Sequence, residues 1–153
     1  MLVLRSGGIS IQQLQSCVGA DITIRTKKHG EFKPETEKIE GPGQFLRHYA
    51  PNIDSYLYRG EDADLSKAIL IDFGGNLLRH RDACKHYIDL SADGSVIEAI
   101  SNLYDKLRWA ETHQDVEIVL IADLMHFETA RGDEYLDALY DKLYRATSGR
   151  HRF

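Results

Sequence analysis

The run AILIDF at residues 68–73 decides which fold this sequence can adopt. Its side chains are apolar at every position except Asp72, and polar and apolar residues do not alternate along it. A run of this kind is typical of a strand that is covered on both faces, as the strands of a parallel sheet are. Gly74 and Gly75 then break the run. The run therefore predicts a buried strand of an α/β protein.

Strand and helix patterns alternate on both sides of this run. The predicted strands are residues 53–58, 68–73, 87–90 and 116–122, and the predicted helices are residues 77–85, 93–111 and 133–147. Strands and helices that alternate at these lengths require right-handed crossovers and a mostly parallel sheet. We therefore predict an α/β fold, a mostly parallel sheet with flanking helices, over residues 53–148, followed by a tail at residues 149–153.

The helix predicted at residues 93–111 has the clearest amphipathic pattern in the chain. Apolar residues recur on one side of it at helical spacing. This stripe consists of Ile97, Ile100, Tyr104 and Leu107, widened by Val96 and Leu103. The last helix is expected to turn a second apolar row inward, made of Leu136, Leu139 and Leu143, with Tyr140 and Tyr144 alongside.

Residues 1–26 precede the α/β region and have the pattern strand, helix, strand. Ser10 and Gln13 have the spacing of a capping box for a short helix over residues 11–18. Polar and apolar residues alternate over residues 21–26, as they do in a half-buried strand. One short helix and two strands cannot bury enough surface to fold alone. We therefore expect this piece to dock on another part of a protein.

Residues 27–52 have the composition of an exposed linker, with mixed charge and little periodicity. They include the stretch GPGQFLRHYAP at residues 41–51, where Pro42 and Pro51 restrict the backbone at both ends. Between the two prolines lie a guanidinium, an imidazole and a phenol, carried by Arg47, His48 and Tyr49. Such a segment suits a strap that crosses a binding site. An ordinary interdomain linker is the alternative.

The composition excludes several classes of protein. A chain of 153 residues that is 42% apolar and 28% charged is typical of a soluble globular domain with a real core. A net charge of −5 argues against the basic surface of a stand-alone nucleic-acid binder. Cys17 and Cys84 form no CxxC motif and no disulfide framework, which favours a reducing compartment. The sequence contains no apolar run long enough to cross a bilayer and no signal-peptide pattern, so we expect a cytoplasmic protein.

Other motifs are too weak to assign a site. Gly74 and Gly75 follow a buried strand, as a phosphate-binding turn does, but GxGxxG spacing and a Walker lysine are absent, which favours a plain turn. The residues nearest to a zinc motif, although their spacing matches none, are His80, Cys84 and His86. The polar residues near strand ends, where open α/β sheets bind ligands, are Asp89, Asp93, Asp123 and His126. The sequence does not show whether these four converge.

The strap resembles the linker of the two-domain threonylcarbamoyl-AMP synthases, which are YrdC-like enzymes with an extra C-terminal domain. In that family the linker has the form S-P-G-M-x-Y-x-H-Y-x-P and folds over the active site. The chain matches this form at Pro42, Gly43, His48, Tyr49 and Pro51, and departs from it at Gly41, Gln44 and Leu46. The resemblance implies that the strap binds substrate or ATP through Pro42, Gly43, Arg47, His48 and Tyr49.

Further segments resemble the same enzymes, in the same order along the chain. Residues 2–19 are similar to the closing segment of the YrdC-like catalytic domain, whose R-x-G begins here at Arg5. This implies that residues 1–26 are a C-terminal stub of that domain and that Arg5 contacts the ATP phosphates. Residues 86–107 and 138–146 are similar to parts of the family's C-terminal domain, which implies that the predicted sheet is Rossmann-like.

The family's activity would require more than this chain. The enzymes are nucleotidyltransferases that convert L-threonine, bicarbonate and ATP, with magnesium, to threonylcarbamoyl-AMP and diphosphate, for threonylcarbamoyladenosine modification of tRNA. The chain lacks the family's basic nucleotide-binding motif and its S-x-N and S-T segments, so we expect no catalytic residue in it and no activity alone. The expected partners are a YrdC-like catalytic domain, in cis or in trans, which holds ATP and L-threonine, and downstream tRNA-modification proteins. We therefore expect a regulatory or gating portion of the synthase.

Other hypotheses stay open. The chain could be a fragment, a truncated gene product or one half of a split enzyme. It could also be a stand-alone Rossmann-like module that binds a nucleotide or small ligand at its strand ends, and such binding should survive deletion of residues 1–51. A third hypothesis is a protein-interaction domain or a decaying gene remnant without a ligand, which predicts exposed apolar surface on residues 1–26.

Overall fold

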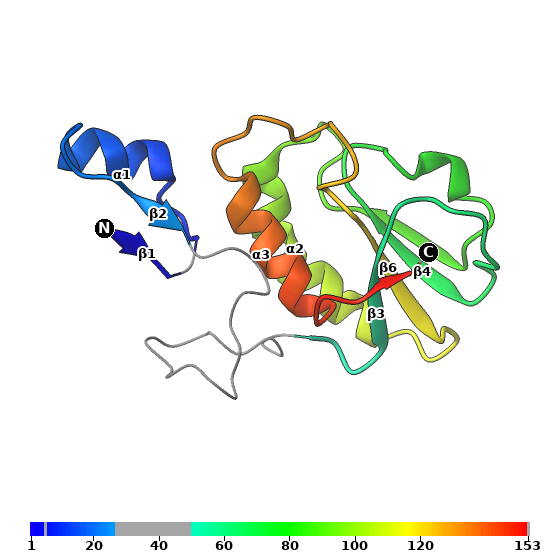
Figure 1. Cartoon of the computed structure of the whole chain (residues 1–153). Coiled ribbons are helices and arrows are strands. Elements are labelled where there is room, and N and C mark those ends of the chain that lie inside the picture. Colours follow the sequence, from blue (N-terminus) through cyan, green and yellow to red (C-terminus); the bar gives the residue numbers. More distant parts are fainter. Residues whose placement is uncertain (5, 27–49, 153) are drawn as a thin grey trace.

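The computed structural model describes residues 1–4, 6–26 and 50–152. Two units follow each other along this part of the chain, a small N-terminal unit and an α/β domain (Figure 1). The N-terminal unit consists of β1 (Leu2–Val3), α1 (Ile11–Val18) and β2 (Arg25–Thr26). Of the helices in the described ranges, none has the length and apolar character needed to cross a membrane.

The α/β domain is built on one sheet of five strands that all run parallel. The strands are β3 (Asp54–Tyr58), β4 (Ala68–Asp72), β5 (His86–Asp89), β6 (Ile118–Ala122) and β7 (His151–Arg152). Their order across the sheet is β5-β4-β6-β3-β7. Every residue of β4 is buried, which confirms the strand predicted from the apolar run. The predicted α/β fold with a parallel, Rossmann-like sheet is confirmed.

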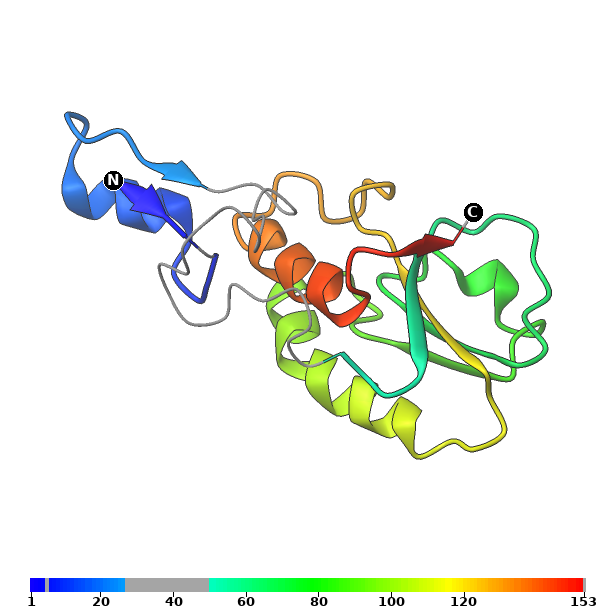
Figure 2. The ribbon, with the colours of Figure 1, turned by 60° about the horizontal axis from the view of Figure 1, so that its bottom comes forward.

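Two helices cover one face of the sheet. α2 (Val96–Glu111) and α3 (Leu136–Ala146) pack side by side there, and the short 3-10 helix η1 (Leu78–His80) lies on the other side (Figure 2). The connections from β3 to β5 advance toward one edge of the sheet, and those from β5 to β7 return toward the other. Right-handed crossovers in opposite directions place their connecting segments on opposite faces. The connection that leaves β4 leads toward β5, and the connection that leaves the adjacent strand β6 leads toward β7. Between two such strands, open α/β sheets form a crevice at the carboxyl ends.

The buried face of α2 differs from the predicted stripe. Its buried residues are Val96, Ala99, Leu103, Leu107 and Ala110. Ile97 is 60% exposed, and Ile100 and Tyr104 are only partly buried against the core. The alanines in the buried row let the helix backbone approach the sheet closely, whereas the prediction considered only large apolar side chains. The prediction of an inward Ile97 is therefore wrong.

Two predicted helices are shorter in the structure. Between residues 77 and 85 only η1 forms, and its backbone bonds join residues three apart, from the His80 N–H to the Leu77 carbonyl at 2.9 Å and from the Arg81 N–H to the Leu78 carbonyl at 3.1 Å. α3 begins at Leu136 and not at Asp133, and the Asp133 carboxylate accepts from the Tyr135 N–H at 2.8 Å in the turn that precedes the helix.

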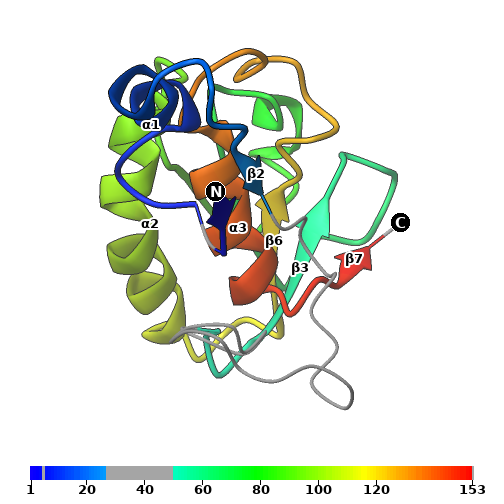
Figure 3. The same cartoon turned by 60° about the vertical axis from the view of Figure 1, so that its left-hand side comes forward.

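The predicted tail at residues 149–153 contains β7, which pairs with β3 at the edge of the sheet (Figure 3). Arg150 helps to hold this edge. Its guanidinium lies over the Tyr56 ring, 4.6 Å from the ring centroid, and donates to Asp54 Oδ1 at 2.8 Å. The sequence did not predict this strand because two residues are too few to show an alternating pattern.

The N-terminal unit has a capped helix, but that helix is not packed into a hydrophobic core. The predicted capping box is confirmed, since the Ser10 hydroxyl accepts from the Gln13 N–H at 3.1 Å and the Gln13 side chain accepts from the Ser10 N–H at 2.9 Å. β1 and β2 pair over two residues each, so the strand predicted at residues 21–26 is limited to its last two. None of the residues of α1 is buried.

Candidate functional site

All residues that the resemblance assigns to substrate binding lie outside the described ranges. These residues are Arg5, Pro42, Gly43, Arg47, His48 and Tyr49. Two described surfaces bear on function. One is the edge of the sheet at the carboxyl ends of its strands, and the other is the N-terminal unit with the part of the domain next to it.

Asp72 at the end of β4 is fully buried and holds the turn that follows. Its carboxylate accepts from the N–H groups of Phe73 at 2.7 Å and Leu77 at 2.9 Å, and from the Tyr87 hydroxyl at 2.6 Å. Burial raises the pKa of Asp72 more than these hydrogen bonds lower it. Burial and the bond to Asp72 raise the pKa of the Tyr87 phenol. Because the carboxylate is enclosed by its own donors, it serves the fold of the turn.

The turn after β4 has the shape of an anion-binding site, and that site is already filled. Gly74 and Gly75 both have positive φ, 62° and 69°, so their successive N–H groups can point toward one place. The Asp89 carboxylate accepts from the Gly74 N–H at 3.2 Å and from the Gly75 N–H at 3.0 Å. A side-chain carboxylate thus stands where a phosphate would lie in a phosphate-binding turn. This agrees with the plain turn that the sequence favours.

The loop after β6 fills the crevice beside this turn. A Cβ atom on Gly74 would lie 2.8 Å from Thr129 Cγ2, and a Cβ atom on Gly94 would lie 3.1 Å from the same methyl group. Thr129 Oγ1 also donates to Asn76 Oδ1 at 2.6 Å, across 53 residues of sequence. The strand-end position that a free nucleotide-binding module would use is therefore occupied by the protein's own side chains.

Asp123 at the end of β6 is also fully buried. Arg59 Nε donates to Asp123 Oδ2 at 2.9 Å, and His151 Nδ1 lies 3.5 Å from the same oxygen. The hydrogen bond to Asp123 raises the pKa of Arg59. Burial, together with the nearby Asp123 carboxylate, raises the pKa of Tyr140 to about 12. Asp123 thus links the ends of the adjacent strands β3, β6 and β7.

The four polar residues predicted near strand ends do not form one cluster. In the described ranges, no side-chain hydrogen bond or ion pair joins any two of Asp89, Asp93, Asp123 and His126. Asp93 is exposed, and the His126 ring lies 5.1 Å from the Phe127 ring, centroid to centroid. The carboxylates at this edge bind backbone and arginine donors of the domain, and they do not converge on a shared ligand position.

The three residues nearest to a zinc motif have separate partners. His80 packs edge-on against the Tyr58 ring, with centroids 5.8 Å apart, and His86 Nε2 lies 3.2 Å from Asp115 Oδ1. Cys84 Sγ donates to the His86 carbonyl oxygen at 3.3 Å. In the part of the chain that the structure describes, no three His, Cys, Asp or Glu side chains are grouped so that they could hold a metal ion.

The N-terminal unit carries large apolar side chains on its surface. The exposed fractions are 50% for Met1, 53% for Leu2, 63% for Ile9 and 42% for Ile22. Apolar side chains that gather on the surface of a soluble protein mark interaction sites. The exposure agrees with the expectation that residues 1–26 dock on another part of a protein. It agrees equally with the hypothesis of an interaction domain or gene remnant, which predicts exposed apolar surface on the same residues.

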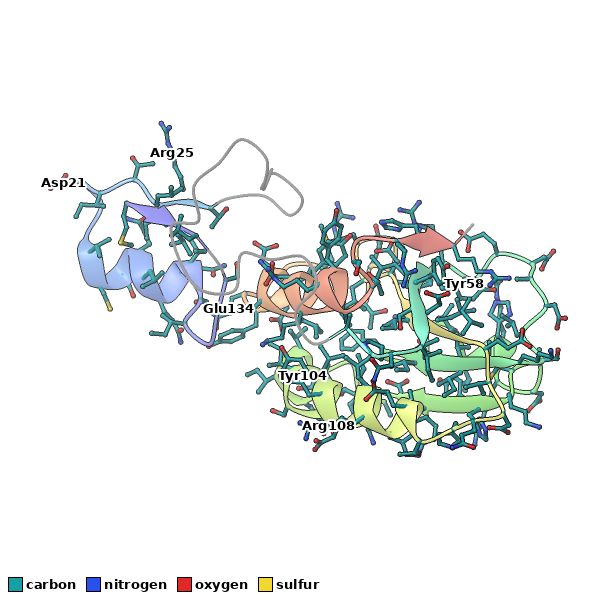
Figure 4. The ribbon with its side chains drawn as sticks, turned by 90° about the horizontal axis from the view of Figure 1, so that it is seen from below. Asp21, Arg25, Tyr58, Tyr104, Arg108 and Glu134 are labelled. Carbon is teal, nitrogen blue, oxygen red and sulfur yellow. The ribbon has the colours of Figure 1, made fainter. Side chains whose placement is uncertain are left out.

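A hydrogen bond joins this unit to the α/β domain. Ser10 is 3% exposed, and its hydroxyl donates to Glu134 Oε2 at 2.5 Å. Figure 4 shows Glu134 on the side of the domain that faces the N-terminal unit. The two residues are 124 positions apart, and no sequence pattern connects them, so the sequence does not predict this contact.

Comparison with protein families matches residues 9–148 to the family described as "Threonylcarbamoyl-AMP synthase, C-terminal domain". The matched range includes α1, β2, the strap and the α/β domain as far as the end of α3. Comparisons with curated proteins and with solved structures found no match. The family match covers most of the chain and agrees with the motifs in the strap and with the parallel sheet. This chain therefore belongs to the threonylcarbamoyl-AMP synthase C-terminal domain family, which connects it with threonylcarbamoyladenosine modification of tRNA.

Proposed function

We propose that the chain is the C-terminal, gating portion of a two-domain threonylcarbamoyl-AMP synthase. In this proposal it binds a YrdC-like catalytic domain, in cis or in trans, and lays its strap across the ATP-binding pocket of that domain. The observation that carries the proposal is the N-terminal unit, whose large apolar side chains are exposed. Its helix has no buried residue, and the segments that flank this helix carry four exposed apolar side chains, Met1, Leu2, Ile9 and Ile22. In a member of this family, such a unit calls for a partner surface.

The proposed chemistry divides between the two parts. The catalytic domain holds ATP, with magnesium, and L-threonine, and carries out the nucleotidyl transfer. Arg5 and Arg47 are cations suited to phosphate oxygens. His48 can carry charge near neutral pH, and the Tyr49 phenol can donate, accept and stack. A strap closed over the product would keep water from the mixed anhydride of threonylcarbamoyl-AMP.

The test mixes the 153-residue chain with a separately purified YrdC-like catalytic domain, ATP, magnesium, L-threonine and bicarbonate. Diphosphate release reports synthesis, and AMP release reports hydrolysis of threonylcarbamoyl-AMP. We expect the chain to lower the AMP-to-diphosphate ratio. Replacing Tyr49 or His48 by Ala should weaken this lowering of the ratio by a factor of about two to ten, as expected for the loss of one hydrogen bond.

Gln44→Ala is the matched control, because this position lies in the strap but departs from the family's pattern. It should leave the ratio within twofold of the unsubstituted chain. If the chain binds the catalytic domain but leaves the ratio unchanged, the gating role is wrong. If the Tyr49 and His48 variants protect the product as well as the unsubstituted chain does, the assignment of those two residues is wrong.

A further inference from the structure

Part of the parallel sheet is open to solvent on the face opposite α2 and α3. Side chains alternate between the two faces along a strand, so Asp54, Tyr56 and Tyr58 of β3 share one face, and Ile118 of β6 pairs with Asp54 on that same face. Tyr58 packs against the His80 ring of η1, which identifies this as the face away from the two long helices. Tyr56 and Ile118 are only partly buried there, although the faces of a parallel sheet are normally both covered. This part of β3 and β6 therefore has room for a further molecule.

A pocket of about 320 Å³ lies on this open part of the sheet. Its lining comes from β3, β6 and β7 and from the connections that precede β4 and β6. The residues of the lining that bear on its chemistry are Tyr56, Asp64, Lys67, Glu117, Ile118 and Arg152. Pockets that hold small molecules have volumes of about 300–1,000 Å³, and this one is at the lower end of that range. Its size therefore suits a small ligand.

Most of the charges around the pocket are neutralised within the protein. The Lys67 ammonium forms an ion pair with the Glu117 carboxylate. Asp54, which also borders the pocket, accepts from the Arg150 guanidinium at 2.8 Å. Each pair cancels one positive and one negative charge, so neither pair calls for a ligand.

Asp64 and Arg152 are the two opposite charges of the lining that remain. In the part of the chain that the structure describes, the Arg152 guanidinium forms no ion pair, and the Asp64 carboxylate accepts from the Ser66 N–H at 2.9 Å. This bond from Ser66 lowers the pKa of Asp64 most, and the nearby charges of Lys67 and Arg152 lower it further, so Asp64 is ionised at neutral pH. The two charges thus face one pocket without pairing with each other. A ligand between them can satisfy both if it carries an anionic and a cationic group.

We propose that this pocket binds the zwitterion of an α-amino acid with an apolar side chain. The α-carboxylate of the ligand accepts from the Arg152 guanidinium, and its α-ammonium donates to the Asp64 carboxylate. The apolar side chain of the ligand packs on Tyr56 and Ile118. A simple anion would meet the lining carboxylates without compensation, and a simple cation would meet the guanidinium. The site lies at the amino ends of β4 and β6, away from the filled crevice at the carboxyl ends, and it is independent of the proposed function.

NMR titration of the isotope-labelled 153-residue chain with L-leucine tests the inference. We expect saturable shifts of the backbone amide signals at residues 64–67, 117–118 and 152. Two matched compounds each lack one of the charged groups, 4-methylpentanoate the ammonium and 3-methylbutylamine the carboxylate. Each should bind with a Kd higher by about tenfold or more, because one charge-assisted hydrogen bond is lost.

Two variants of the chain test the same two contacts from the protein side. Arg152→Gln and Asp64→Asn should each raise the Kd for L-leucine by about tenfold or more. Asp64→Asn keeps an oxygen that can accept from the Ser66 N–H, and the spectrum without ligand checks that each variant is folded. Arg108→Gln is the matched control, because this side chain is 76% exposed and belongs to α2 on the other face of the sheet. It should change the Kd by less than about twofold.

Three results would overturn the inference. L-leucine could give no saturable shifts, or its shifts could gather at residues outside the pocket. 4-methylpentanoate could bind as tightly as L-leucine does, which would make the pocket an anion site. Binding could also be unchanged in both Arg152→Gln and Asp64→Asn. Because the titration contains no catalytic domain, none of these results bears on the proposed function.

Discussion

Alanine substitutions at the two adjacent glycines after β4 test whether the β6–α3 loop fills the strand-end crevice. Gly74 and Gly75 both have positive φ, so alanine at either position costs roughly 1–2 kcal/mol in backbone strain. Only Gly74 faces a neighbour, because its Cβ would lie 2.8 Å from Thr129 Cγ2, while a Cβ on Gly75 has nothing within 4 Å. Overpacking of this kind typically lowers the free energy of unfolding by a further amount of about 1–3 kcal/mol.

We therefore expect Gly75→Ala to lower the free energy of unfolding by about 1–2 kcal/mol and Gly74→Ala to lower it by about 2–5 kcal/mol. With a urea m-value of about 1–3 kcal/mol/M, the extra cost at Gly74 lowers the urea midpoint by about 0.3–3 M. Urea unfolding followed by the fluorescence of Trp109, the only tryptophan in the sequence, measures both. This ring packs against the His113 ring with centroids 4.4 Å apart, so its emission should change on unfolding.

A double variant separates the steric cost from the backbone cost. Thr129→Ser removes Cγ2 and keeps the hydroxyl that donates to Asn76. In the Thr129→Ser background, Gly74→Ala should cost no more than Gly75→Ala does. Equal costs of the two alanine substitutions in the unsubstituted chain would refute the reasoning, because they would mean that Thr129 does not lie against Gly74. A failure of Thr129→Ser to reduce the cost would refute it as well.

Three other substitutions test the buried carboxylate of Asp72 and the buried face of α2. Tyr87→Phe removes a hydrogen bond that lowers the pKa of Asp72, so the folded-state pKa of Asp72 rises further and the ionised form is penalised. Urea unfolding should therefore show a loss of about 1.5–3 kcal/mol at pH 7 that shrinks toward about pH 4, and a loss independent of pH would contradict an ionised acceptor. Leu103→Ala should cost about 2–5 kcal/mol in thermal unfolding, whereas Ile97→Ala should change stability by about 0.5 kcal/mol or less. Similar costs for the two would mean that α2 does not bury the face described above.

The sequence by itself was sufficient for features that depend on local pattern. The run at residues 68–73 predicted a buried parallel strand, because a strand covered on both faces is apolar at successive positions. The spacing of Ser10 and Gln13 predicted the capping box, since that motif lies within one helical turn. The motifs of the strap pointed to the family that the match over residues 9–148 then showed. Each of these signals lies within a short segment and requires no knowledge of the path of the chain.

Only the tertiary structure decided which distant groups meet. Asp89 and Thr129 both contact the turn at Gly74, and Ser10 donates a hydrogen bond to Glu134. Each contact joins residues that are separated in the sequence, and no periodic pattern connects them. The buried face of α2 depended on how closely its backbone could approach the sheet, which the hydrophobicity of Ile97 does not reveal. Contacts between loops are set by how the elements pack, and their polar and small residues give no signal in the sequence. The family was therefore readable from the chain, while the contacts of Asp89 and Thr129 with the turn at Gly74 were decided by the fold.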